Sequence, residues 1–336
     1  MNKVGRLCIM VLVVALLTSC QSSPVPVSSQ PEPEPWETAQ LFLAYATSQG
    51  DQEESIGILN TKILEASEGR IYCNAYPSGA MGSDQELMNA VRSGALTVVQ
   101  LATSVQTKQI PELALLDTPY LFSDLDSCNE QLSGPLLEFF QPYYNREGLQ
   151  LLAWYCPGFR QLSCNIPVER PRDLKRLKIR ILDNPYHQIY WSAVGAQPVV
   201  IPFSDLFYAI QQGIVNAQEN PPNAAISIQL QQLQDYIILT DHLPFISAVV
   251  MNKADFDQLA PEDQQIVTQA FQEHCSSMRP MMSTEELKAY FSYVLSPSEQ
   301  LQEALLQGGD AVRQALSQDL GADITEQFYS IMEESA

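Results

Sequence analysis

Short apolar runs alternate with longer amphipathic segments along most of the chain. Apolar runs of about 4–8 residues are typical of buried strands, and longer segments with apolar residues every three or four positions are typical of helices. We therefore predict strands over residues 41–46, 70–76, 96–102, 149–155, 177–182, 197–202 and 236–239. We predict helices over residues 52–67, 127–144, 185–194, 204–212, 261–278 and 284–306. This alternation indicates an α/β fold with helices packed on both faces of a sheet.

Local end signals and the chain length refine this architecture. Ser83 stands three residues before Glu86, which is the spacing of a capping box, and Gly94 suits the left-handed residue that ends a helix. These signals predict a helix between Ser83 and Gly94. The chain has 336 residues, which is more than one hydrophobic core usually supports, so we expect two lobes.

The N-terminus has the layout of a lipoprotein signal peptide over residues 1–19. Lys3 and Arg6 precede an apolar run, residues 7–17, that is too short to span a bilayer. The run leads into Leu-Thr-Ser-Cys, which resembles a bacterial lipobox, where the peptidase cleaves before the cysteine and a lipid is attached to its sulfur. We therefore predict lipidation of Cys20. The alternative is an ordinary signal peptide that happens to contain this cysteine.

A proline-rich segment follows the predicted lipid site. Residues 20–36 contain five prolines together with serines and glutamates, and no other stretch of the chain is apolar enough to be a membrane span. Such a composition is typical of an extended linker. We predict a tether that holds an extracytoplasmic body, in the periplasm or at the cell surface, to the membrane through Cys20.

Charge narrows the choice of partners. The chain carries 18 cations and 39 acids, a formal net charge of −21, which disfavours nucleic acid as a partner. Seven of the 18 cations lie within 21 residues, at Arg160, Arg170, Arg172, Lys175, Arg176, Lys178 and Arg180. This is the one electropositive region that could attract an anion. The alternative for most of these side chains is a solvated loop and turn.

Signatures of enzymes and metal sites are missing from the sequence. It contains no G-x-S-x-G, H-E-x-x-H, P-loop or G-x-G-x-x-G motif. His187, His242 and His274 are far apart and lack metal-ligand spacing, and no C-x-x-C occurs. Cys156 and Cys164 are a conceivable disulfide pair, and buried free thiols are an equal alternative. We predict a binding protein, not an enzyme, with no cofactor and no metal.

Three motifs follow one another between residues 154 and 221. The first is Trp-Tyr-Cys-Pro-Gly-Phe-Arg, ending at Arg160, and the second is Asp-Leu-Lys-Arg-Leu-Lys-Ile-Arg, ending at Arg180. The third motif spans residues 201–221. It begins with Ile-Pro-Phe, which contains Phe203, and ends with Gln-Glu-Asn-Pro, which contains Asn220. Together they resemble the solute-binding proteins of tripartite ATP-independent periplasmic (TRAP) transporters, of the DctP type.

The resemblance covers about residues 41 to 274. Residues 76–82 are similar to the family's early P-x-G-x-L-G turn, and residues 118–122 are similar to its P-F-L-F segment. Several positions depart from the family pattern, namely Thr97, Arg176, Asp205, Phe207, Asn216 and Ala217. These departures are compatible with the fold, but they leave the identity of the ligand open.

The resemblance implies a set of ligand-binding residues. Arg180 would hold the ligand's carboxylate through two parallel hydrogen bonds. A guanidinium group offers this geometry and an ammonium group does not. Arg160 and Asn220 would lie in the same cleft. The alternatives are a structural ion pair for Arg180 and for Arg160, and a turn cap for Asn220.

Three further side chains complete the predicted site. Phe203 would form a wall of the pocket, with core packing as the competing interpretation. Tyr76 and Asp84 would face the cleft near the start of the helix that follows the second strand. Their placement rests on the family resemblance alone.

The resemblance also implies the arrangement of the lobes and the function. We expect strands that cross between two lobes and a long helix that spans both. Lobe I would comprise residues 37–157 and 246–283, and lobe II residues 158–245 and 284–336. The protein would capture a small carboxylate and deliver it to a TRAP-type permease. The alternative is a solute-sensing or scaffold lipoprotein that serves a partner other than a permease.

Overall fold

The computed structural model describes residues 38–45, 52–76, 79–278 and 282–334, which all belong to one compact unit, Pro35–Ala336. The predicted signal peptide, the tether and Cys20 lie outside the described residues. None of the described helices combines the length and apolarity needed to cross a bilayer.

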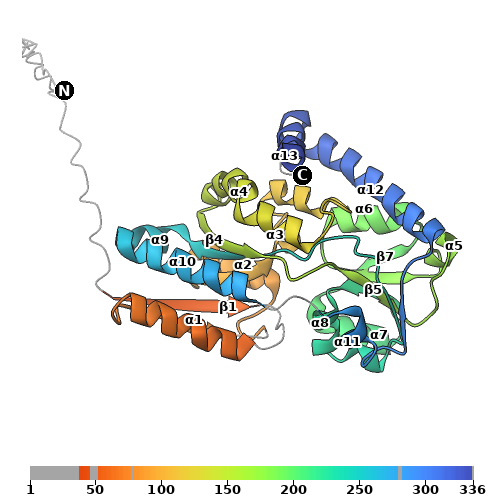
Figure 1. Ribbon diagram of the computed structural model, residues 1–336, viewed down its shortest axis with the longest axis horizontal. Coiled ribbons are helices and arrows are strands. Elements are labelled where there is room, and N and C mark those ends of the chain that lie inside the picture. Colours follow the sequence, from red (N-terminus) through yellow and green to blue (C-terminus); the bar gives the residue numbers. More distant parts are fainter. Residues whose placement is uncertain (1–37, 46–51, 77–78, 279–281, 335–336) are drawn as a thin grey trace, which may run out of the picture. The chain divides into compact units, whose positions relative to one another are not determined.

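Two mixed sheets form the framework of this unit (Figure 1). The first sheet has the order β2-β1-β3-β10-β4, with β1 at Ala39–Tyr45, β2 at Ile71–Tyr76, β3 at Val98–Ala102, β4 at Leu149–Tyr155 and β10 at Ser247–Asn252. Strand β1 runs parallel to β2 and β3, whereas β10 is antiparallel to β3 and β4.

The second sheet has the order β11-β9-β5-β8-β6-β7. Its strands are β5 at Gln161–Cys164, β6 at Lys178–Ile181, β7 at Gln197–Val200, β8 at Ala217–Asn220, β9 at Tyr236–Ile238 and β11 at Tyr293–Leu295. Strand β6 lies at the centre of the parallel part, between β7 and β8. Its Arg180 therefore projects from a strand that is held on both sides.

Helices cover both faces of the first sheet. The helices α1 (Gln52–Ala66) and α10 (Pro261–Ser277) pack on one face. The helices α2 (Asp84–Ser93), α3 (Leu125–Ser133) and α4 (Pro135–Arg146) pack on the other. Helix α2 begins after Ser83, whose N–H and hydroxyl both donate to the Glu86 carboxylate, and ends at Gly94 with φ 75°. The α/β architecture and this helix are confirmed.

The remaining elements are short, apart from three helices. Helices α6 (Pro185–Ala193) and α12 (Glu299–Leu320) pack with the second sheet in one core. Helix α13 spans Ala322–Glu334. The short elements are α5 (Pro171–Leu174), α7 (Leu206–Gln211), α8 (Pro222–Ser227), α9 (Lys253–Gln258), α11 (Thr284–Leu287), η1 (Thr103–Val105), η2 (Pro111–Asp117), η3 (Phe203–Asp205) and η4 (Leu230–Gln232).

Two antiparallel segments carry the chain between the sheets. One leads from β4 to β5 and the other from β9 to β10, and they pair through a bridge between Phe159 and Pro244. The Arg160 N–H donates to the Leu243 carbonyl at 2.8 Å, and this bond fixes the first segment just before β5. The predicted crossing strands and two-lobed fold are confirmed.

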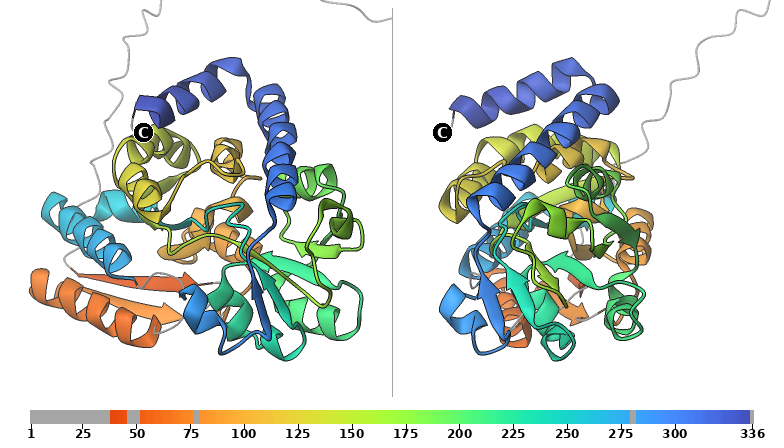
Figure 2. Two further views of the ribbon diagram at one scale, coloured as in Figure 1. Left: turned by 45° about the vertical axis from the view of Figure 1, so that its right-hand side comes forward. Right: turned by 90° about the vertical axis from the view of Figure 1, so that its right-hand side faces the viewer.

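Helix α12 connects the two halves (Figure 2). At Gly308 it lies so close to α6 that a Cβ atom there would overlap Val194. At the next residue, Gly309, it lies against Pro119, which follows η2. Helix α13 then places Phe328 against Phe140 of α4, with ring centroids 6.0 Å apart. The predicted lobe-spanning helix is therefore α12.

Two predicted helices are wrong in their extent. The segment 127–144 is divided at Gly134 into α3 and α4, because Pro135 has no N–H to continue the first helix. The segment 284–306 contains α11, strand β11 and only the start of α12. Helix α11 ends ten residues before Pro297 and β11 intervenes, and the Ser298 hydroxyl accepts the Leu301 N–H as the N-cap of α12.

Four strands were not predicted, namely β5, β8, β10 and the strand β11 described above, and the described cysteines are unpaired. Strand β8, Ala217–Asn220, is almost entirely polar yet fully buried, so no apolar pattern marks it. Strand β5 has only four residues, and both β5 and β10 follow directly on the crossing segments. The described cysteines are all buried free thiols, at Cys73, Cys128, Cys156, Cys164 and Cys275. This decides between the two alternatives for Cys156 and Cys164.

Candidate ligand-binding site

Two adjoining cavities lie where the ends of the two sheets meet. The outer cavity has a volume of about 840 Å³ and is lined by the start of α2, by residues 200–207 and by the end of α8. The inner cavity has a volume of about 50 Å³ and reaches the ends of β1, β3 and β8. The residues that line both are Asp84, Val105, Arg180, Leu182 and Phe203. A volume of this size suits a small organic ligand.

Arg180 lies at the junction of the two cavities. Its side chain is buried, with 3% of the residue exposed, and its Nε donates to the Ile201 carbonyl at 2.7 Å. The guanidinium carbon lies 5.8 Å from the centre of the Phe203 ring. Within the described part of the chain, Arg180 forms no ion pair. Burial lowers the pKa of Arg180 to about 10, so the guanidinium stays charged at neutral pH.

Arg160 lines the inner cavity but is already paired. It is 1% exposed, and its Nε and Nη2 both donate to the carboxylate of Glu219, the second of these bonds at 2.9 Å. Nη2 also donates to the Asn220 side-chain oxygen at 3.0 Å. The positive charge of Arg160 is therefore largely compensated within the protein.

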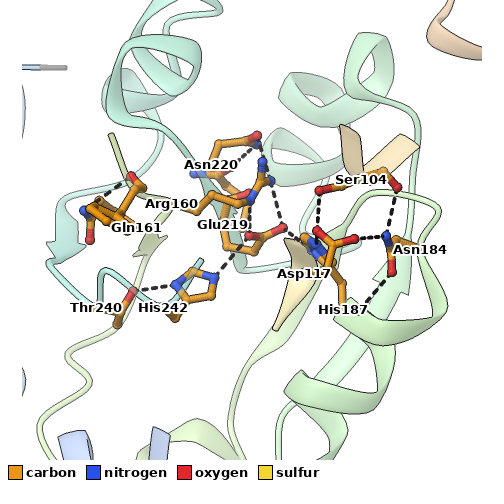
Figure 3. Close-up of polar contacts among 12 residues, drawn as sticks. Ser104, Asp117, Arg160, Gln161, Asn184, His187, Glu219, Asn220, Thr240 and His242 are labelled. Atoms are coloured by element: carbon orange, nitrogen blue, oxygen red, sulfur yellow. Dashed lines mark hydrogen bonds and ion pairs between the residues drawn. The ribbon is translucent and has the colours of Figure 1, made fainter. Parts of the chain in front are cut away.

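Glu219 is the centre of a buried polar cluster (Figure 3). Besides Arg160, it contacts His242 Nε2 at 3.2 Å and His187 Nδ1 at 3.4 Å. Burial by itself would raise the pKa of the Glu219 carboxyl, but Arg160 and His187 hold it well below its usual range. The carboxylate is therefore charged throughout the physiological pH range, with no exposure to solvent.

The cluster continues from Glu219 into the segments that follow β3 (Figure 3). The other ring nitrogen of His187, Nε2, lies 3.2 Å from a carboxylate oxygen of Asp117 in η2. Asp117 also accepts hydrogen bonds from Ser104 at 2.5 Å and from Asn184 at 2.7 Å. Burial by itself would lower the pKa of His187, but Glu219 and Asp117 raise it to about 9. His187 is thus a buried cation between two carboxylates.

Three further predicted ligand-binding residues line the cavities, namely Asn220, Phe203 and Asp84. Asn220 ends β8 and donates to Gln218 at 2.6 Å while accepting from Arg160, so its amide is held in one orientation. Phe203 lies between Arg180 and the small apolar core around α7. Asp84 is half-buried in the first turn of α2. Burial raises the pKa of Asp84, and the charge of Arg180 opposes this.

Five of the six ligand-binding candidates are thus brought together, and one is not. Tyr76 lines neither cavity, and its ring instead stacks on Phe42 with centroids 6.5 Å apart. Sequence reasoning missed Glu219, although it lies inside the quoted Gln-Glu-Asn-Pro motif, because nothing in the local pattern shows its partners. It also missed His187 and Asp117, whose separation of 70 residues hides their contact.

Comparison with known proteins places this chain in a family. Residues 45–318 match the family "Bacterial extracellular solute-binding protein, family 7" (DctP). The chain is 29% identical, over 74% of its length and 76% of the relative's, to the 2,3-diketo-L-gulonate-binding periplasmic protein YiaO of Escherichia coli (strain K12). It is 28% identical, over 63% of its length and 61% of the relative's, to the C4-dicarboxylate-binding protein DctB of Bacillus subtilis (strain 168).

A solved structure agrees with this assignment. The sugar acid binding protein DctPAm from Advenella mimigardefordensis, determined in complex with galactonate, superposes with a TM-score of 0.82 and 21% sequence identity. The superposition covers 89% of this chain and 99% of the other. At this identity the likeness establishes the fold. Together with the family match over most of the sequence, it shows that this chain belongs to the bacterial extracellular solute-binding proteins of family 7, the DctP family.

Proposed function

We propose that this protein captures a small organic carboxylate outside the cytoplasm and delivers it, unchanged, to a TRAP-type membrane permease. Two observations outside the site support this. The related YiaO and DctB are named for a sugar acid and a dicarboxylate, so carboxylates recur among the relatives. Several of the similar solved structures are described as TRAP periplasmic solute-binding proteins.

The observation that carries the proposal is the state of Arg180. It is a buried guanidinium at a cavity of about 840 Å³, and it is free of any carboxylate partner in the described residues. A buried cation without an anion is costly, and a ligand carboxylate would remove that cost. Hydrogen bonds to charged groups contribute about 1.5–3 kcal/mol each, so a bidentate contact would provide a large part of micromolar affinity.

Replacement of Arg180 tests this role. We expect Arg180→Ala to abolish carboxylate binding, measured by isothermal titration calorimetry after ligands have been found by thermal-shift screening of an organic-acid collection. Arg180→Lys should bind much more weakly than the natural protein, because ammonium cannot form the parallel pair of bonds. Arg172→Ala is the matched control, since its side chain is 73% exposed and belongs to the same run of cations. Full binding by Arg180→Ala would refute the proposal.

The predicted lipid anchor and the permease are tested in cells. Cys20→Ser should shift the protein from the membrane fraction to the soluble extracytoplasmic fraction and abolish labelling by a fatty-acid analogue. Crosslinking of the natural protein in the presence of its ligand should capture permease subunits. Ligand binding without any permease contact would instead support a sensing or scaffold lipoprotein, the alternative role.

A further inference from the structure

The charges at the cavity limit which carboxylates can enter. Two arginines face it, but Arg160 is neutralised by Glu219, so Arg180 is the one arginine with charge to spare among the described lining residues. The other lining cation is Lys108, at the rim, and it forms an ion pair with Asp183. The described residues therefore provide one unpaired cationic anchor, Arg180, for a carboxylate.

A carboxylate of the protein lines the same two cavities as this anchor. Asp84 lines both cavities, and its charge interacts with that of Arg180 without the two forming an ion pair. Nor does Asp84 pair with any other cation in the described ranges. It differs in this from Glu86, whose carboxylate is bound by the N–H and hydroxyl of Ser83. Asp84 is thus an acceptor that faces the ligand's space.

The sum of charges points the same way. The outer cavity is lined by two cations, Lys108 and Arg180, and by three acids, Asp84, Glu86 and Asp183, which gives 2 − 3 = −1. One ligand carboxylate can be held at Arg180. A second carboxylate would enter a region whose formal charge is already negative, and like charges brought together there disfavour binding.

We propose that the ligand is a monocarboxylate with a hydrogen-bond donor at its other end, and that Asp84 selects it by accepting that donor and repelling dicarboxylates. This inference rests on the proposed function and narrows the class of ligand, which the relatives leave open. The donor is a hydroxyl or an ammonium group, since both suit a carboxylate acceptor. The apolar wall of Ile201, Phe203 and Phe207 then faces the ligand's carbon chain.

Matched acids separate these possibilities. Galactonate and galactarate share one carbon skeleton and differ in the second carboxylate, and erythronate and tartrate form a shorter pair of the same kind. Hexanoate lacks the donor, and 6-aminohexanoate carries an ammonium instead of hydroxyls. For the natural protein, calorimetry should show the donor-bearing monocarboxylates binding more than about tenfold tighter than the matched dicarboxylates. The better of the two donor classes identifies the donor.

Substitution of Asp84 tests its part directly. Asp84→Asn keeps the shape and removes the charge, so the preference for galactonate over galactarate should fall by more than about tenfold. Asp126→Asn is the matched control, because Asp126 is also acidic and in the first turn of a helix but is exposed and outside both cavities. It should leave the preference unchanged. Circular dichroism should show that both variants are folded.

The possible results of these experiments show separately whether the role of Asp84 fails and whether the proposed function fails. If carboxylates bind through Arg180 but dicarboxylates or hexanoate bind as tightly as the donor-bearing acids, the role of Asp84 is refuted and the function stands. The same holds if Asp84→Asn keeps the natural preference. If no carboxylate binds the natural protein, both the function and this inference fail.

Discussion

Replacement of His187 by glutamine is expected to remove a pH-dependent part of the fold's stability. Both ring nitrogens of His187 face carboxylates, Asp117 at 3.2 Å and Glu219 at 3.4 Å. Both nitrogens therefore act as donors, which requires the imidazolium form. Glutamine has an amide of similar reach but no charge, so the change isolates the contribution of the cation.

The magnitude follows from the two pKa values. The pKa of His187 is about 9 in the folded protein, and an unfolded histidine has about 6.5. A difference of about 2.5 corresponds to a stabilisation on the order of 3 kcal/mol. Because the folded pKa is the higher one, this stabilisation is fully present below about pH 6.5 and is lost as the pH rises to about 9.

Urea denaturation at a series of pH values measures this effect. The free energy of unfolding of His187→Gln should lie below that of the natural protein at about pH 6, and the gap should shrink by a few kcal/mol towards about pH 9.5. A gap that does not change with pH would show that His187 is not protonated in the fold, and would refute the reasoning.

His274 offers a control of opposite sign. Burial lowers the pKa of His274, and its Nδ1 lies 3.2 Å from the Ser55 hydroxyl rather than near a carboxylate. A lowered folded pKa costs stability below the unfolded value and costs nothing well above it. His274→Gln should therefore gain stability relative to the natural protein as the pH falls below about 6.5.

Two further substitutions test other parts of the structure. Glu219→Gln should lower the free energy of unfolding by about 3–5 kcal/mol in urea denaturation, because it leaves Arg160 buried without its carboxylate; a loss below about 1 kcal/mol would show that the ion pair is dispensable. Gly308→Ala should cost about 1–3 kcal/mol in the same assay, since its new methyl group would overlap Val194. The matched Gly57→Ala, on the exposed side of α1 with nothing within 4 Å of the new atom, should instead gain up to about 1 kcal/mol.

Local patterns in the sequence determined those features whose causes are themselves local. The capping residues around Ser83 and Gly94 predicted helix α2, and the apolar run at 149–155 predicted β4, because each depends on neighbours within a few positions. The amphipathic pattern alone would join helices that the structure separates, because Pro135 starts α4 directly after α3 ends and strand β11 lies between α11 and α12. The motifs that end at Arg160 and Arg180 identified the family, since their order and spacing match the family pattern.

The tertiary structure alone decided how the charges are used. Arg160 and Arg180 look alike in the sequence, yet Arg160 is neutralised by Glu219, 59 residues away, whereas Arg180 has no ion-pair partner among the residues that the structure describes. Strand β8 carries polar residues into the core, and their burial is tolerable only because distant partners satisfy them. Such pairings depend on how the two sheets pack together. The local pattern of polar and apolar residues does not show which distant residues this packing brings into contact.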